Sequence, residues 1–294
     1  MAFAPEFDER QFSELTKGIE IPAQPLTLIE VDREAAKGEP SLHKMAEVIS
    51  KDLGVSAGVL RAVNSPLFGM RKKVSSIDHA VQMLGTRNVK GIVASIALRE
   101  SLSKRSSPAM DRFMDSASDC ALVCSHLAKE LRIMVPEEAY TLGLFHDIGI
   151  PMMIMRFPNY KDVLIEANRD ATFSITEVED RHLGTNHAVV GYLIAHSWKL
   201  PQPICEAIFN HHRAEELLRG LGVTQDGAET KGLCATVSML MMAEHISYSY
   251  RKRTDFHEWQ RAGAAILDFF AILPEEFETM KEEIWGVLRE ERAE

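Results

Sequence analysis

The 294-residue chain carries 33 lysines and arginines against 43 aspartates and glutamates, a formal net charge of −10. Binding to nucleic-acid phosphates needs a basic surface, so this balance argues against a general nucleic-acid binder. The hydrophobic share of 46% is typical of a globular protein. Because no uncharged apolar run reaches the roughly 18 residues that a membrane helix needs, we expect no membrane association.

The N-terminus and the cysteines indicate the cellular compartment. Residues 1–10 are mixed and acidic, unlike a signal peptide. The four cysteines are Cys120, Cys124, Cys205 and Cys234, and no two of them have CxxC spacing. Cys120 and Cys124 lie one helical turn apart on an apolar stripe, which predicts buried free thiols. These features predict a protein of the reducing cytoplasm.

Helical periodicity runs through nearly the whole chain. After Ser41, which is placed to cap a helix, apolar residues recur at spacings of three and four. The next helix stops at Asn64, and another opens at residues 75–78 and ends at Gly85. A further helix is predicted over residues 87–102. No stretch alternates as a strand does between hairpin turns, so the predicted class is all-α.

Two polar segments interrupt the helices. The first comprises residues 103–108 and precedes a long helix. The second, residues 220–232, is rich in glycine and is predicted to be a loop. The acidic tail, residues 275–294, is predicted to be a surface helix, with docking to a partner as the alternative. Its apolar anchors are Ile284, Trp285 and Leu288.

The dipeptide His146-Asp147 is the most informative feature for function. It lies within residues 142–150, an otherwise apolar helical run. A buried carboxylate is costly unless it is paired, hydrogen-bonded or bound to a metal. In helical phase, His146 continues the inward row of Ala139 and Leu142. An adjacent imidazole and carboxylate at a helix end can both reach one metal ion.

Three more histidines and a glutamate share this inward phase. His187 lies on the apolar stripe of its helix, and His211 and His212 continue the apolar face of the next one. Glu244 stands where a hydrophobic residue is expected. Burying four histidines and Asp147 unpaired would be costly, so they must satisfy one another or share a metal. Imidazole and carboxylate ligands suit zinc, iron, manganese or nickel.

These residues occur among motifs that resemble the HDOD domain, a bacterial signalling branch of the HD metal-dependent phosphohydrolase superfamily. The similarity covers about residues 19–213. Its main motifs are Ile-Pro-Ala-Gln-Pro at 21–25, Leu-Arg-Ala-Val-Asn-Ser at 60–65, Gly-Leu-Phe-His-Asp-Ile-Gly at 143–149, Asn-His-Ala-Val-Val-Gly at 186–191 and His-His at 211–212. Their order and spacing together are specific, whereas any one of them would be a weak signal.

The resemblance implies a three-part organisation. Residues 1–105 are predicted to be the N-terminal helical part of the HDOD module, and residues 106–218 an HD-like helical core. Residues 219–294 are predicted to be a loop and C-terminal helices that complete the domain.

Four departures from HD phosphohydrolases bear on catalysis. The resemblance implies a metal held by an upstream histidine, the His-Asp pair and a late aspartate. Asp115 stands in the place of that histidine and Glu244 in the place of that aspartate, and both can still ligate a cation. Ile150 replaces a lysine frequent in HD-GYP phosphodiesterases, which removes a cation that would neutralise a phosphate. No Gly-Tyr-Pro follows His211-His212.

The favoured hypothesis is a non-catalytic signalling module that binds a partner protein or a small signal around the His/Asp cluster. The alternative is a metal-dependent phosphohydrolase of a nucleotide or cyclic dinucleotide, with His146 and Asp147 catalytic and Asp147 bridging two metals. A metal or redox sensor is a third hypothesis. The sequence leaves the metal, the ligand and the oligomeric state open. The full set of predicted metal ligands is His146, Asp147, His187, His211, His212, Asp115 and Glu244.

Overall fold

The computed structural model describes residues 18–19, 22–64, 73–103, 108–169, 172–221, 227–251 and 257–291. Within these ranges the regular structure is helical and no β-strand is present, which confirms the all-α class. The chain divides into two compact units. We call residues 22–115 with 287–294 the N-terminal unit, and residues 1–21 with 116–286 the central unit.

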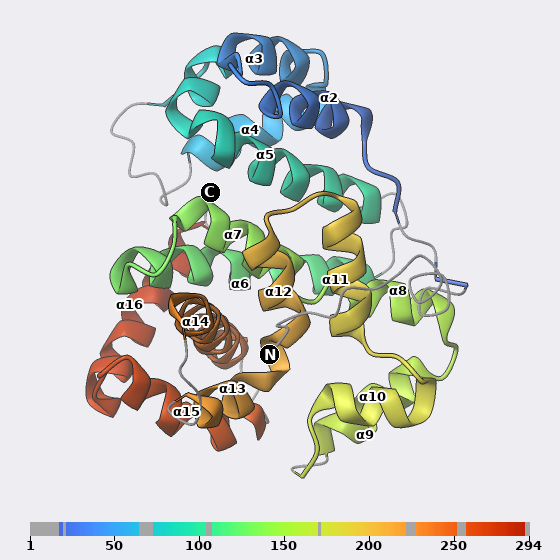
Figure 1. Cartoon of the computed structure of the whole chain (residues 1–294), viewed down its shortest axis with the longest axis vertical. Helices are drawn as coiled ribbons and strands as arrows, with labels where there is room; N and C mark the ends of the chain where they lie inside the picture. The colour runs from blue at the N-terminus through green and yellow to red at the C-terminus, as the bar shows by residue number, and fades with distance from the viewer. Residues whose placement is uncertain are drawn as a thin grey trace. The chain divides into compact units, whose positions relative to one another are not determined.

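The N-terminal unit is organised around one long helix. Its helices are α2 (Leu26–Ala35), α3 (Leu42–Ser50), α4 (Leu53–Asn64) and α5 (Ile77–Ser103). Figure 1 shows α2, α3 and α4 gathered along α5, and each of them contacts it. Gly58 permits the close approach of α4, since a Cβ there would lie 2.8 Å from the side chain of Ile96 on α5.

Local signals in this unit act as predicted. The Ser41 hydroxyl accepts a hydrogen bond from the backbone N–H of Lys44 and caps α3. The predicted break at Gly85 is present as a kink inside α5, where the glycine has φ of 71° and ψ of 166°. Glycine adopts this left-handed φ without the steric cost that a Cβ would bring.

The central unit contains the remaining helices. They are α6 (Pro108–Leu131), α7 (Pro136–Phe145), α8 (Gly149–Arg156), α9 (Tyr160–Arg169), α10 (Ile175–Leu183), α11 (His187–Ser197), α12 (Gln202–Asn210), the 3-10 turn η2 (His211–Arg213), α13 (Ala214–Gly220), α14 (Ala228–Tyr250), α15 (His257–Phe269) and α16 (Pro274–Glu291). The division between the units falls inside α6 and α16. Helices α7, α8, α11, α12 and α14 pack against one another, and most of the site described below lies on them and on η2.

Helix α11 lies in the core of this unit and has buried side chains on every face. All residues of α11 from His187 to Ala195 except Val189 are buried. Trp198, which follows α11, packs edge-on against Phe145 of α7 with ring centroids 5.9 Å apart. A helix that is apolar all round needs partners on all its faces, and α8 and α12 supply them.

Three further predictions can be compared with the structure. All four cysteines are buried and none of them forms a disulfide, as predicted. The tail forms α16, in which Ile284 and Leu288 are buried and the Trp285 indole donates to the carbonyl of Ile246 at 3.1 Å. The predicted loop over residues 220–232 is too long, because α14 begins at Ala228 and its polar first turn is solvated. None of the described helices combines the length and apolar character required to cross a bilayer.

Asn64 at the end of α4 connects this helix to Val74, and its substitution tests how much this connection stabilises the N-terminal unit. Its amide donates to the carbonyls of Leu60 and Val74, both at 2.8 Å, and its oxygen accepts from the Val74 N–H at 2.7 Å. We expect Asn64→Ala to lower the free energy of unfolding by about 2 kcal/mol, since buried Val74 loses partners for both backbone groups. Urea titration measures this change.

The matched control is Asn168→Ala. The Asn168 amide makes a single exposed hydrogen bond, to the Leu164 carbonyl one turn earlier, so we expect a change within about 0.5 kcal/mol. Equal effects of the two substitutions would show that Asn64 does not clamp Val74.

Candidate metal centre

The turn between α7 and α8 presents His146 and Asp147. The chain stays close to helical there, because the His146 N–H bonds to the Leu142 carbonyl at 2.9 Å and the Ile150 N–H to the Asp147 carbonyl at 2.9 Å. Gly149 is required at this turn. A Cβ on it would lie 2.0 Å from the carbonyl oxygen of His187, so only glycine lets the start of α11 approach.

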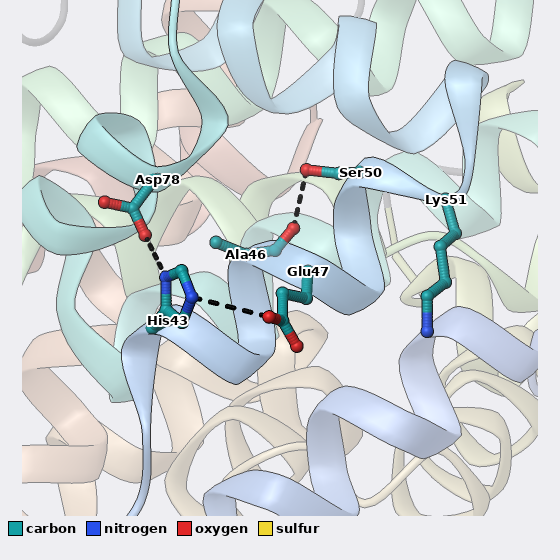
Figure 2. Close-up of a pocket in the computed structure, with 6 residues that line it drawn as sticks. All are labelled: His43, Ala46, Glu47, Ser50, Lys51 and Asp78. Carbon is teal, nitrogen blue, oxygen red and sulfur yellow. Dashed lines mark hydrogen bonds and ion pairs between the residues drawn. The ribbon is translucent and has the colours of Figure 1, made fainter.

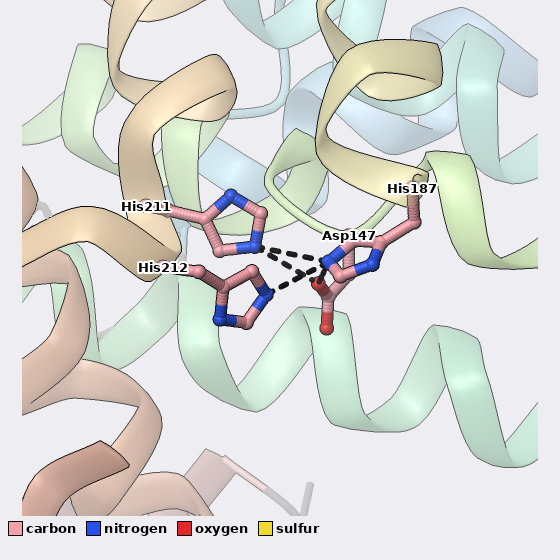
Figure 3. A group of neighbouring side chains, drawn as sticks. All are labelled: Asp147, His187, His211 and His212. Carbon is pink, nitrogen blue, oxygen red and sulfur yellow. Dashed lines mark hydrogen bonds and ion pairs between the residues drawn. The ribbon is translucent and has the colours of Figure 1, made fainter. Parts of the chain in front are cut away.

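The other members of the cluster come from three separate elements. His187 is the first residue of α11, where the Asn186 side chain caps the helix by accepting from the Val189 N–H. His211 and His212 form the 3-10 turn after α12. Glu244 lies within α14. Figure 3 shows Asp147 and the three histidines His187, His211 and His212 directed at one another.

The first ligand group consists of one carboxylate oxygen and three imidazole nitrogens. Asp147 Oδ1 lies 3.4 Å from Nε2 of His187 and 3.4 Å from Nε2 of His211. His187 Nε2 lies 3.3 Å from His211 Nε2 and 2.8 Å from His212 Nε2. Ligand atoms of these four residues all fall within 4.8 Å of one another, a spacing that could hold a metal ion.

The second ligand group uses the other oxygen of the same aspartate. His146 Nε2 lies 3.2 Å from Asp147 Oδ2 and 3.6 Å from Glu244 Oε1. These three residues also satisfy the spacing of a metal site. Asp147 therefore faces the three-histidine group with Oδ1 and the His146–Glu244 group with Oδ2.

The outer nitrogen of each histidine has an acceptor. His146 Nδ1 lies 2.7 Å from the Gly143 carbonyl, and His211 Nδ1 lies 2.6 Å from the Ile208 carbonyl. The Nδ1 atoms of the other two histidines lie against carboxylates of α10 and α15. Acceptors at every Nδ1 fix the proton there, so each neutral ring turns the lone pair of Nε2 toward the cluster.

This tautomer makes the centre of the cluster electron-rich. Two neutral imidazoles cannot hydrogen-bond through facing Nε2 lone pairs, yet His187 meets both His211 and His212 in this way. A cation or a proton at this place resolves the conflict. The second oxygen of Glu244 is also buried without a hydrogen-bond partner. Imidazole nitrogens and carboxylate oxygens suit zinc, iron, manganese or nickel, so the residues fit a metal.

The pKa shifts of the cluster without a metal indicate the same demand for positive charge. Burial disfavours the charged form of His187, but the carboxylates of Glu179 and Asp147 outweigh burial and raise its pKa to about 10. Burial likewise works to raise the pKa of Asp147, yet His146 and the other histidines hold that pKa well below its usual range. Burial raises the pKa of Glu244 to about 7, although His146 opposes the shift. A proton on His187 thus takes the place that a metal ion would occupy.

Six of the seven predicted ligands fall within these two groups, and their role as ligands stays a prediction. Asp115 is exposed on α6 and belongs to neither group. Ile150 lies on α8, half-buried.

Sequence reasoning missed two buried carboxylates behind the histidines, Glu179 and Glu258. Each lies on the apolar face of its helix, four residues from a hydrophobic position: Glu179 after Ile175, and Glu258 before Ala262. The helical-phase argument that identified Glu244 could have found both of them.

A surface pocket of the N-terminal unit offers a contrast. It measures about 330 Å³ and is lined by His43, Ala46, Glu47, Ser50, Lys51 and Asp78 (Figure 2). His43 Nδ1 lies 2.9 Å from Asp78, and Nε2 lies 3.4 Å from Glu47. The bond to Asp78 raises the pKa of His43. Because the imidazole is 73% exposed, water competes for these ion pairs and they contribute little to stability.

Fold and site together define an all-helical protein with an enclosed histidine–carboxylate cluster that could hold a metal ion. The chain belongs to the HDOD domain family, whose model matches residues 21–214. A protein of Treponema pallidum (strain Nichols) is 25% identical to it over 194 residues, which are 66% of this chain and 38% of that protein. The chain therefore spans about two fifths of the length of that relative.

Two solved structures share the fold over almost the whole chain. An HDOD domain protein from Geobacter sulfurreducens has a TM-score of 0.67 at 21% identity, covering 96% of this chain and 95% of that one. A protein from Shewanella amazonensis SB2B, named as a candidate phosphohydrolase, has a TM-score of 0.63 at 23% identity, covering 95% and 94%. These two structures confirm the helical architecture, and the family-model match confirms the HDOD resemblance.

The close approach at Gly149 generates a prediction. We expect Gly149→Ala to lower the free energy of unfolding by about 2 kcal/mol or more, because the new methyl group meets the rigid backbone of His187 at 2.0 Å. The displaced imidazole should also weaken metal uptake. Thermal melting with and without added Zn²⁺ measures both effects.

Gly286→Ala in α16 is the control, since nothing lies within 4 Å of a Cβ there. Alanine is favoured over glycine inside a helix, so this variant should be as stable as the parent or slightly more stable. A Gly149→Ala protein with unchanged stability and metal uptake would contradict the packing argument.

The raised pKa of His187 predicts the pH dependence of the metal-free protein. When the pKa of a basic group is higher in the folded protein than in the unfolded chain, the group stabilises the fold fully at pH values below its unfolded-state pKa. This stabilisation is lost as the pH rises through the folded-state pKa. We therefore expect the free energy of unfolding in chelator to fall between about pH 6.5 and about pH 10. Urea titration across this range measures it.

The His187→Gln variant should show a shallower decline over the same range, because it lacks the titrating imidazole. Bound metal should also flatten the decline, since a metal ion holds the deprotonated form. A metal-free parent whose stability is flat or rising across this window would show that the pKa of His187 is not raised in the folded protein.

Proposed function

We propose that this chain is a non-catalytic HDOD signalling module whose structural centre is a metal held by His146, Asp147, His187, His211, His212 and Glu244. Its output would pass to a partner protein or to a small signalling ligand. The observation that supports the proposal best is the convergence of four Nε2 atoms and two carboxylates in an enclosed cluster. The four buried cysteines form no disulfide, which suits a reducing compartment, and we propose a cytoplasmic location.

Enclosure favours a structural role for the metal. The side chains of His187 and His211 are fully buried, and Asp147 is the most exposed of the six at 15%. Structural metal sites are closed by protein ligands, whereas catalytic sites keep a position open for water or substrate. When bound, the metal would supply positive charge to the buried carboxylates and a shared partner for the imidazoles.

The charges around the cluster argue against phosphodiester hydrolysis. In the part of the chain that the structure describes, the ion pairs of Asp147 and Glu244 all run to histidines. Ile150, which takes the place of a lysine, supplies no charge to a phosphate. Transition-state charge in phosphoryl transfer is stabilised largely by preorganised cations. The ion pairs of Asp147 and Glu244 in the described residues include no lysine or arginine that could neutralise a phosphate.

A second candidate function rests on Asp147. A carboxylate that turns one oxygen to each of two ligand groups is the arrangement used to hold two metal ions, and paired metals stabilise the attacking and leaving oxygens in hydrolysis. A phosphohydrolase acting on a nucleotide or cyclic dinucleotide is therefore the alternative. The similar Shewanella protein bears a name of this kind.

One experiment separates the two functions. Protein purified without chelator is analysed for zinc, iron, manganese and nickel, and then incubated with cyclic and linear dinucleotides in each metal-loaded form. We expect bound metal, stabilisation by about 2.7 kcal/mol at a hundredfold excess of free metal over its dissociation constant, and intact dinucleotides.

The control is the double variant His146→Ala, Asp147→Ala, which lacks the carboxylate shared by both ligand groups and the imidazole next to it. Product formation by the parent above this control would establish the phosphohydrolase. Absence of any metal, together with a melting temperature that chelator does not change, would refute the metal centre.

A further inference from the structure

The four histidines of the centre differ in what holds them from behind. His146 and His211 each contact the carbonyl of the residue three positions earlier, a local bond within their own turn. His187 and His212 instead contact carboxylates that come from other helices, Glu179 on α10 and Glu258 on α15. Both carboxylate-backed imidazoles belong to the three-histidine group.

Glu179 is held in a single orientation. It is fully buried, and its Oε2 accepts from the backbone N–H of His187 at 2.9 Å and lies 2.7 Å from His187 Nδ1. Its Oε1 accepts from the hydroxyl of buried Tyr160. A carboxylate fixed by three donors can itself fix the plane and the tautomer of the imidazole it contacts.

Glu258 plays the matching part for His212. Its Oε2 lies 2.6 Å from His212 Nδ1, and its Oε1 accepts from the backbone N–H of Ile175 at 3.4 Å. The residue is 8% exposed. It therefore joins α15 to the first turn of α10 and to the turn that carries His212.

The distribution of charge around the two ligand groups supports the same distinction between them as the contacts do. Within the described residues, the ion pairs of Asp147, Glu179, Glu244 and Glu258 all run to histidines. With neutral imidazoles, the three buried glutamates and the largely enclosed Asp147 carry four negative charges, which two divalent cations would balance. Three of these carboxylates contact the three-histidine group, and only Asp147 and Glu244 contact the His146 group.

We propose that Glu179 and Glu258 are positioning residues for metal, and that they make the group of Asp147, His187, His211 and His212 the tighter of the two sites. The inference rests on the metal centre of the proposed function. A carboxylate behind an imidazole orients the ring and makes its free nitrogen a stronger donor. In the described part of the chain, His146 Nδ1 meets the Gly143 carbonyl and no such carboxylate, so the His146 group binds its cation second and more weakly.

Titration of chelator-stripped full-length protein with Co²⁺ tests this proposal, with visible absorption reporting coordination. We expect two classes of site in the parent. Glu179→Gln and Glu258→Gln keep an acceptor oxygen of the same size but remove the charge, and each should weaken the tight class by about 10- to 100-fold. The weak class should stay within about threefold of the parent, because neither residue contacts His146 or Glu244.

Glu166→Gln is the matched control. Glu166 Oε1 lies 3.0 Å from His182 Nε2 in an exposed pair outside both ligand groups, so its loss should leave both classes unchanged. Should Glu179→Gln fail to fold, Tyr160→Phe tests the same contact by releasing Glu179, and a severalfold weaker tight class is expected.

Thermal melting of the metal-free variants separates positioning from a structural role. A positioning role predicts weaker Co²⁺ binding and an altered absorption spectrum in proteins that remain folded. Variants that melt earlier but bind Co²⁺ as the parent does would overturn the positioning role alone. A parent that takes up no Co²⁺ would overturn the metal centre itself, and the positioning role with it.

Discussion

The electrostatics of one shared carboxylate organise the central unit. Asp147 meets imidazoles of two ligand groups through its two oxygens, and it belongs to both groups. A buried carboxylate is tolerated only where donors or cations surround it. The turn between α7 and α8, the start of α11 and the turn after α12 must therefore meet at one point.

The backbone is adapted to this requirement. Helix ends carry backbone groups without helical partners, so polar side chains are accommodated there more easily than in a helix interior. Asp147 and His187 lie at such ends, and His211 and His212 lie in the turn that ends α12. Close approach of the elements then depends on Gly149, where any side chain would enter the backbone of His187. Glu244 is the exception, since it lies within α14 and is buried by its neighbours.

Periodicity predicted much of this arrangement, because helical phase is a local property that a sequence records directly. It placed His187 and Glu244 on inward faces, and local reasoning predicted the helix end at Gly85 that the structure has as a kink within α5. The length of α14 was underestimated because its first turn is exposed, so polar residues there look like a loop.

The contacts across the centre could not be predicted, because they depend on tertiary packing. Glu179 and His187 are close in sequence, yet nothing local shows that the carboxylate turns back to the imidazole. His212 and Glu258 are 46 residues apart and belong to different helices. Helical phase predicts that a carboxylate faces inward, but the packing of α10 and α15 determines which histidine it contacts.

The centre also includes residues that lie outside the part of the chain matched by the family model. The match ends at residue 214, whereas Glu244 and Glu258 lie on α14 and α15 beyond it. Without these two residues, His212 would lack its Nδ1 partner, and His146 Nε2 would lose one of its two carboxylate neighbours. The C-terminal helices are thus part of the centre. Linkage is reciprocal, so whatever holds His212 in place also favours the present position of α15. A shift of α15 would in turn move Glu258 and change the position of the ligand His212.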